Sequence, residues 1–161
     1  MRPDLARLVL AATLITALSS PVLAADTSGH VNVERKGERV MPFSMGATMH
    51  MFRPTPDGGV QTVMVHNGDE RQVLLVRSHL RKEAAAFARG DFTDPAAIHG
   101  DGMPGLQAMR TGARRISVRY SERPNGAAII YATRDPKLVS AIHAWFHAQV
   151  SDHGAHAAMT M

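Results

Sequence analysis

The sequence predicts one α+β domain, in which two strand–strand–helix units form a four-stranded antiparallel sheet with two helices on one face. Two observations support this fold class. Turn signals rich in Pro, Gly, Asp and Asn, at residues 54–59 and 123–126, each separate a pair of short segments with strand character. Each pair is followed by a long segment whose apolar residues recur at the spacing of an amphipathic helix.

In the first unit, we expect strands at residues 46–52 and 60–66, followed by a helix over residues 70–89 that Gly90 closes. On this helix an apolar stripe, spaced by three and four residues, is expected to face the sheet. Its members are Val73, Val76, Leu80, Ala84 and Phe87.

In the second unit, we expect strands at residues 115–121 and 127–133. The helix that follows is predicted to begin at Pro136, because Asp135 is a good N-cap and Pro is favoured at the first helical position. Its predicted buried stripe consists of Val139, Ile142, Phe146 and Val150, flanked by Leu138 and Trp145.

The ends of the chain lie outside this domain, which is predicted to span residues 41–154. Residues 1–24 have the basic start, short apolar run and small residues of a secretory signal peptide, with cleavage expected after Ala24. No later segment is apolar enough to span a membrane. We expect residues 25–40 to be a flexible lead-in with a short strand near residues 31–33, and residues 155–161 to be a disordered His/Met tail.

The composition favours a metal as the ligand. The chain contains nine His and ten Met but no Cys, and its net charge is only +4. Because its basic residues are scattered, we expect no nucleic-acid partner. A protein of an oxidising compartment that holds a soft metal without thiolates needs thioether sulfur and imidazole nitrogen.

The strongest ligand candidates are five residues that are expected to meet at one place. The long linker, residues 91–112, contains His99 and Met103 among three glycines that allow tight turns. His79 and His143 occupy related positions on the two predicted helices, 64 residues apart, and therefore should face each other across a pseudo-twofold axis. His50 on the first strand is the fifth candidate.

Five further residues are weaker candidates, each with an alternative role. The two strand methionines would equally fill a core, and Glu83 would bind a metal with His79, orient it, or form an ordinary i, i+4 pair. The spacing of His143 and His147 suits metal chelation, but Ala144 replaces the Glu that a zinc peptidase needs. These weaker candidates are Met49, Met51, Glu83, His147 and His153.

Residues 79–92, 94–106 and 135–154 together resemble a family of small exported proteobacterial proteins of uncharacterised biochemistry, and the resemblance covers most of residues 46–154. Some members are labelled aspartate carbamoyltransferase automatically. This chain lacks a Ser-Thr-Arg-Thr carbamoyl-phosphate loop and is too short for that enzyme. Relatives often accompany copper or heavy-metal resistance genes, so the resemblance implies a role in metal handling.

The expected function is that of a periplasmic copper-binding protein which buffers or delivers Cu(I) or Cu(II) and is not an enzyme. Its expected partners are the metal ion and another periplasmic copper protein. Two alternatives remain open: a non-covalent haem-binding protein with His or Met axial ligands, and a metal-free periplasmic interaction module.

Overall fold

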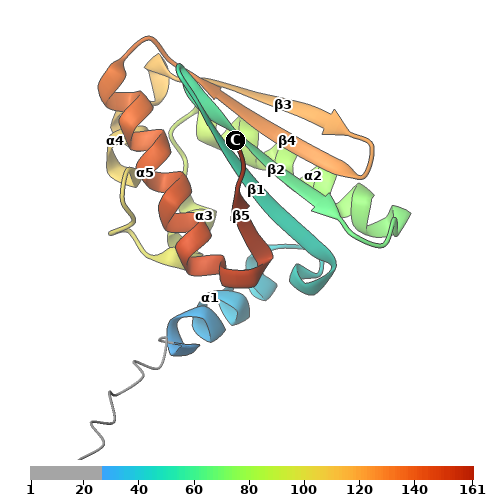
Figure 1. Ribbon diagram of the computed structural model, residues 1–161. Coiled ribbons are helices and arrows are strands. Elements are labelled where there is room, and N and C mark those ends of the chain that lie inside the picture. The colour runs from blue at the N-terminus through green and yellow to red at the C-terminus, as the bar shows by residue number, and fades with distance from the viewer. Residues whose placement is uncertain (1–26) are drawn as a thin grey trace, which may run out of the picture.

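The computed structural model describes residues 27–161, which form five α-helices and one five-stranded sheet (Figure 1). The predicted signal peptide, residues 1–24, lies outside the described residues. None of the described helices is both long and apolar enough to span a membrane. The elements are α1 (Thr27–Val40), β1 (Thr48–Thr55), β2 (Gly58–Val65), α2 (Glu70–Ala88), α3 (Thr93–His99), α4 (Leu106–Gly112), β3 (Ser117–Arg123), β4 (Gly126–Ala132), α5 (Pro136–His153) and β5 (Ala157–Met159), with short 3-10 turns at Met45–Ala47, Ala113–Arg115 and Gly154–His156.

The α+β class and the two strand–strand–helix units are confirmed, but the sheet differs in detail from the prediction. The strand order is β3-β4-β2-β1-β5, with antiparallel pairing among the first four strands. The sheet is mixed rather than antiparallel, because β5 adds a fifth strand that runs parallel to β1.

The C-terminal tail that was predicted to be disordered therefore forms part of the sheet. The chain reverses direction after α5 at Gly154, where the backbone has a φ of 53°. Residues 157–159 then pair with β1, whose outer edge would otherwise leave its backbone groups unpaired (Figure 1). Ala157, which pairs with His50, is buried in the core.

The prediction of a flexible lead-in with a strand near residues 31–33 is also wrong for residues 27–40, which form the helix α1. This helix packs against α3 and α5 at one end of the molecule (Figure 1). Its buried contact surface includes Gly37, where an added Cβ would lie within 4 Å of both Met41 and Met45. Sequence periodicity missed the helix because charged residues dominate the rest of its surface.

The linker is not structureless but contains the short helices α3 and α4. Of the three glycines around His99 and Met103, Gly105 allows close packing, whereas a Cβ at Gly100 or Gly102 would meet nothing within 4 Å. Gly105 has a φ of 81°, and a Cβ there would lie only 2.0 Å from the carbonyl oxygen of Ala141 on α5. The start of α4 therefore lies directly against the backbone of α5, which only glycine permits.

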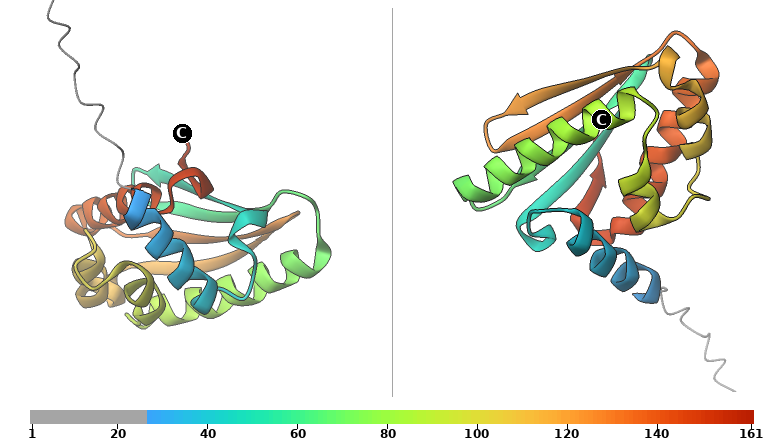
Figure 2. Two further views of the ribbon diagram at one scale, coloured as in Figure 1. Left: turned by 90° about the horizontal axis from the view of Figure 1, so that it is seen from below. Right: turned by 180° about the vertical axis from the view of Figure 1, so that it is seen from behind.

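Both long helices cover the same face of the sheet, as predicted (Figure 2). Tyr131 of β4 contacts Phe87 of α2 and both Trp145 and Phe146 of α5, with ring centroids 5.7–6.5 Å apart. The predicted stripe of α2 is buried throughout. The core consequently lies between one sheet face and the helices α2 and α5.

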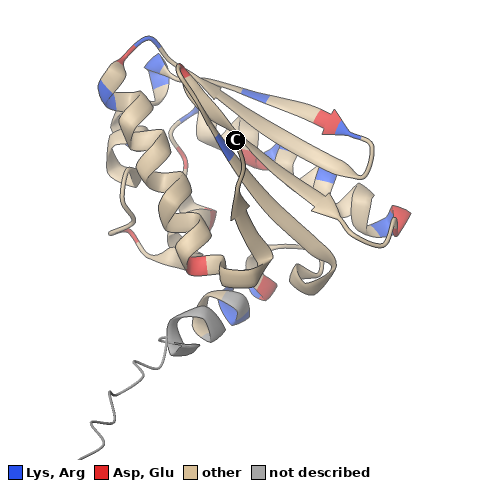
Figure 3. Cartoon of the chain, in the orientation of Figure 1, with Lys and Arg blue, Asp and Glu red and all other residues tan. Residues whose placement is uncertain are grey.

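The buried face of α5 is rotated relative to the prediction. Val139 and Val150, both predicted to be buried, are only half-buried, whereas Trp145 is fully buried. No Lys, Arg, Asp or Glu interrupts this helix between Lys137 and Asp152 (Figure 3). The face that enters the core comprises Leu138, Ala141, Ile142, Trp145, Phe146, Gln149 and His153.

Each long helix also makes side-chain hydrogen bonds to the hairpin turn of the other unit. Arg77 of α2 donates to the carbonyl oxygens of Arg123 at 2.8 Å and of Gly126 at 3.2 Å, around the β3–β4 turn. His143 of α5 places Nε2 3.1 Å from the carbonyl oxygen of Thr55 and 2.8 Å from that of Gly58, around the β1–β2 turn. Because carbonyl oxygens only accept, Nε2 of His143 carries the proton.

We predict that His143→Ala lowers the free energy of unfolding by about 1–3 kcal/mol, because it removes the donor for two carbonyl groups. His147→Ala is the matched control, since His147 is exposed one turn further along the same helix. Its effect should stay within about 0.5 kcal/mol. Urea denaturation at neutral pH measures both, and equal effects would contradict the structural role of His143.

Candidate functional site

Four histidines from four different elements line one cavity at the end of the molecule that α1 covers. They are His50 of β1, His79 of α2, His99 of α3 and His153 of α5. We call this space the inner cavity. It offers about 40 Å³ to the centres of water-sized molecules, enough for a water or two, since one water needs about 10–15 Å³.

Local structure explains how these histidines become buried. Alternation along β1 turns His50 and Phe52 toward the helices, and they are 3% and 0% exposed. His153 ends the buried face of α5 and is 6% exposed. The His153 ring stacks on His50 at a centroid distance of 5.1 Å and meets His99 edge-on at 4.9 Å. Phe43 separates His79 from His50, with ring centroids at 5.6 Å and 6.1 Å.

Two of the buried imidazoles lack a hydrogen-bond partner. Nε2 of His50 and Nε2 of His153 are among four buried side-chain polar atoms of the described residues for which no partner is found. Leaving a buried polar atom unsatisfied costs about 1–3 kcal/mol. Two such atoms in stacked rings therefore need an explanation, and a shared ligand is one that satisfies both.

His99 is held in a defined orientation by a carboxylate. Its Nδ1 lies 2.8 Å from Oδ2 of Asp152, and its side chain is almost fully buried. Because a carboxylate accepts, Nδ1 donates and Nε2 keeps its lone pair in the neutral ring. This is the arrangement by which a carboxylate orients a metal-binding histidine.

Burial keeps these rings neutral. It lowers the pKa of His50 to about 3, with a further lowering from nearby His79, His99 and His156. It lowers the pKa of His79 to about 4 and that of His153 to about 2. The pKa of His99 is also lowered by burial, although Asp152 opposes the shift. Neutral imidazole is the form that binds metal ions.

A carboxyl group lies on the opposite wall of the inner cavity. Glu83 is 5% exposed, and burial together with the adjacent Asp94 raises its pKa to about 7. Lys82 contacts both carboxylates, at 3.8 Å from Glu83 and 3.1 Å from Asp94. Glu83 therefore hydrogen-bonds Asp94 rather than orienting His79, and it holds a proton over part of the neutral range.

Two of the five strongest candidates, His143 and Met103, do not line this cavity. His143 is occupied with the β1–β2 turn. Met103 packs within the hydrophobic core and lines neither this cavity nor the one beside it, because the linker folds into α3 and α4 instead of curling around one point. His50, His79 and His99 line the same cavity, although no direct ring contact joins His79 to the other two.

The weaker candidates divide in the same way. Met49 and Met51 are half-buried on the sheet face opposite His50, and they do not fill the core. His147 is exposed. Glu83 and His153 both line the inner cavity. The sequence interpretation missed Met41, which lines it from the end of α1.

The imidazoles are gathered but not yet arranged as a coordination sphere. In residues 27–161, no group of three or more His, Asp or Glu side chains is placed to hold a metal ion. The His50 and His153 rings stack with an interplanar angle of 28° instead of directing their nitrogens at one point. Metal binding here therefore requires the rings to turn about their side-chain torsions.

We predict that the protein loses stability on acidification from about pH 6.5, the pKa of unfolded histidine. In the folded protein, His50, His79 and His153 have pKa values near 2–4. The unfolded chain therefore binds more protons than the folded chain, and the free energy of unfolding decreases as the pH decreases. Glu83 has a raised pKa in the folded protein. Near pH 5.5 it therefore binds about one proton more in the folded than in the unfolded state, which offsets part of the histidine effect. The expected net loss is about 2 kcal/mol per pH unit around pH 5.5.

Denaturant unfolding at several pH values measures this slope. His153→Gln removes about one of the protons that unfolding takes up, so the slope of the free energy of unfolding against pH should decrease by about 1.4 kcal/mol per pH unit. His66→Ala is the control, because His66 is exposed. A free energy of unfolding that does not change between about pH 7 and pH 5 would refute the burial of neutral histidines.

Comparison with known protein families, with curated proteins and with solved structures found no match to this chain. The functional conclusion therefore rests on the chemistry of the inner cavity.

Proposed function

We propose that this protein binds a copper ion in the inner cavity and serves to buffer or deliver it. The observation that carries the proposal is the pair of buried, unpartnered Nε2 atoms on the stacked rings of His50 and His153. A metal ion bound to both nitrogens would replace the missing hydrogen bonds. Metal binding would also explain why two polar rings are buried although they lower the free energy of unfolding of the metal-free protein.

The proposed ligands are the imidazoles of His50, His99 and His153. His153 contacts both of the others, so a modest turn of its ring can bring three nitrogens to one ion. Asp152 orients the His99 ring through Nδ1, and a metal ion bound at Nε2 would replace the hydrogen bond that this ring makes with Gln149. His79 and Met41 line the same cavity and are candidates for a fourth ligand.

Copper is favoured by the kinds of donor that the cavity offers. Neutral imidazole suits copper in both oxidation states, and the thioether of Met41 favours Cu(I). The absence of Cys fits the predicted export to the periplasm, where thiolates oxidise. A cavity of about 40 Å³ is far too small for a porphyrin, so its size argues for a bare ion over haem.

The burial of the site fits storage and transfer. A metal held between the buried rings of His50, His99 and His153 would exchange slowly with solvent unless a partner opens the site. We therefore propose a second periplasmic copper protein as the donor or recipient of the ion.

We predict that the double variant His50→Phe/His153→Phe loses stoichiometric Cu(I) binding. Phenylalanine preserves ring stacking but has no nitrogen. Because it also removes two unsatisfied polar atoms, the unliganded variant should be as stable as the wild type or up to about 2 kcal/mol more stable. Anaerobic titration against a competing Cu(I) chelator, with denaturant unfolding of the metal-free forms, measures both effects.

His147→Ala is the control and should bind Cu(I) like the wild type. Cu(II) and Zn²⁺ titrations on the same proteins identify the preferred ion. Wild-type affinity in the double variant would refute the site, and tighter binding of Zn²⁺ than of either copper ion would refute the choice of metal.

A further inference from the structure

A second cavity adjoins the inner one and shares His153 as a wall. It is lined by Val33 and Met45 on one side and by the end of α5 and the turn after it, residues 152–156, on the other. We call it the outer cavity. It offers about 340 Å³ to the centres of water-sized molecules, compared with about 40 Å³ in the inner cavity.

Resting on the proposed function, we propose that the outer cavity is the port through which copper reaches the inner site. In this proposal Met45 and His156 bind the arriving Cu(I) ion first. His153, which borders both cavities, then passes it to His50 and His99.

The donor types support this route. A thioether and an imidazole together suit Cu(I), and the outer cavity contains one thioether, from Met45, beside two imidazoles, from His153 and His156. His156 lies close enough to lower the pKa of both His50 and His153. An ion held by His156 is therefore already near the inner ligands.

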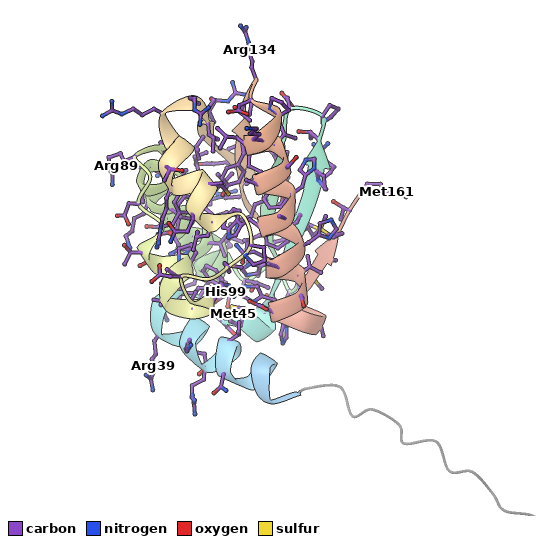
Figure 4. The ribbon with its side chains drawn as sticks, turned by 90° about the vertical axis from the view of Figure 1, so that its left-hand side faces the viewer. Arg39, Met45, Arg89, His99, Arg134 and Met161 are labelled. Atoms are coloured by element: carbon purple, nitrogen blue, oxygen red, sulfur yellow. The ribbon has the colours of Figure 1, made fainter. Side chains whose placement is uncertain are left out.

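Two methionines, Met41 and Met45, lie where the two cavities adjoin. Met45 lines the outer cavity and Met41 the inner one, yet both approach the same point of α1. A Cβ at Gly37 would lie 3.8 Å from Sδ of Met45 and 3.9 Å from Cε of Met41. Met45 and His99 are both labelled at the end of the molecule where α1 lies (Figure 4).

The difference in volume gives each cavity a separate task. The outer cavity has room for an ion that still carries a ligand from its donor, whereas the inner cavity admits only the ion and a water or two. Loading would proceed by exchange of one ligand at a time, so Cu(I) is never released into water. Changes in the outer cavity should therefore alter the rate of Cu(I) uptake, whereas changes in the inner cavity should alter the affinity for Cu(I).

We predict that Met45→Leu/His156→Ala accepts Cu(I) from a coloured chelator complex at least about tenfold more slowly than the wild type, a barrier increase of about 1.4 kcal/mol. Its equilibrium affinity should stay within about threefold, because the inner ligands are unchanged. Anaerobic stopped-flow absorbance of the chelator complex gives the rate, and the competition titration gives the affinity.

Controls separate failure of the port from failure of the fold. Met45→Leu alone preserves side-chain volume and should also slow loading, so the test stands even if the double variant folds poorly. Met109→Leu is the matched control, because Met109 is fully buried but lines neither cavity, and it should load at the wild-type rate.

Two outcomes would overturn the proposal in different ways. Wild-type loading rates in both Met45 variants, with no uptake by His50→Phe/His153→Phe, would refute the port and leave the inner site standing. No Cu(I) uptake by the wild-type protein would refute the inner site and the port together.

Discussion

The rotation of α5 about its own axis determines which of its histidines reach the interior. Trp145 is fully buried and meets Phe87, Phe92, Tyr131 and Phe146 with ring centroids 5.7–6.0 Å apart. Once this large ring is in the core, residues four and eight positions later, Gln149 and His153, must face inward as well. The same rotation turns His143 to the flank, where it holds the β1–β2 turn, and leaves His147 in solvent.

This rotation also connects the fold with the site. The inward-facing end of α5 meets β1 through His153 and His50, and the chain that follows pairs with β1 as β5. Asp152, next to His153, holds His99 at the end of α3. One helix end thus gathers imidazoles from three elements, while α1 covers them. Burying three neutral rings reduces the stability of the unliganded protein, and such losses are typical of functional sites.

Much of the fold was predictable because local signals were strong. The cap at Asp135 and the buried stripe of α2 match the structure, and the predicted turn at residues 54–59 contains the observed one, which is shorter because both strands extend to residues 55 and 58. The helix α1 and the strand β5 were missed for a common reason. Each is short or highly charged, and each is stabilised by contacts with residues distant in the sequence, which local patterns do not contain.

The site was predicted in part, for the same physical reasons. Alternation on β1 identified His50, and helix position identified His79. His153 is only a weaker candidate in the sequence, because residues 151–156 have the composition of a polar tail and not of a buried helix end. Residues 138, 142, 145, 149 and 153 follow helical spacing, so placing Trp145 at the centre would have identified His153. The role of Met41 depends on α1 and had no signal in the sequence.

The central claim is that copper is held by the imidazoles of the inner cavity. X-ray absorption spectroscopy of the copper-loaded protein tests this most directly, because it measures the atoms bound to the metal. The account predicts a shell dominated by imidazole nitrogens at about 2.0 Å, typical of metal–imidazole bonds, with at most one sulfur. A shell of two or more sulfur atoms without the multiple scattering of imidazole would contradict it.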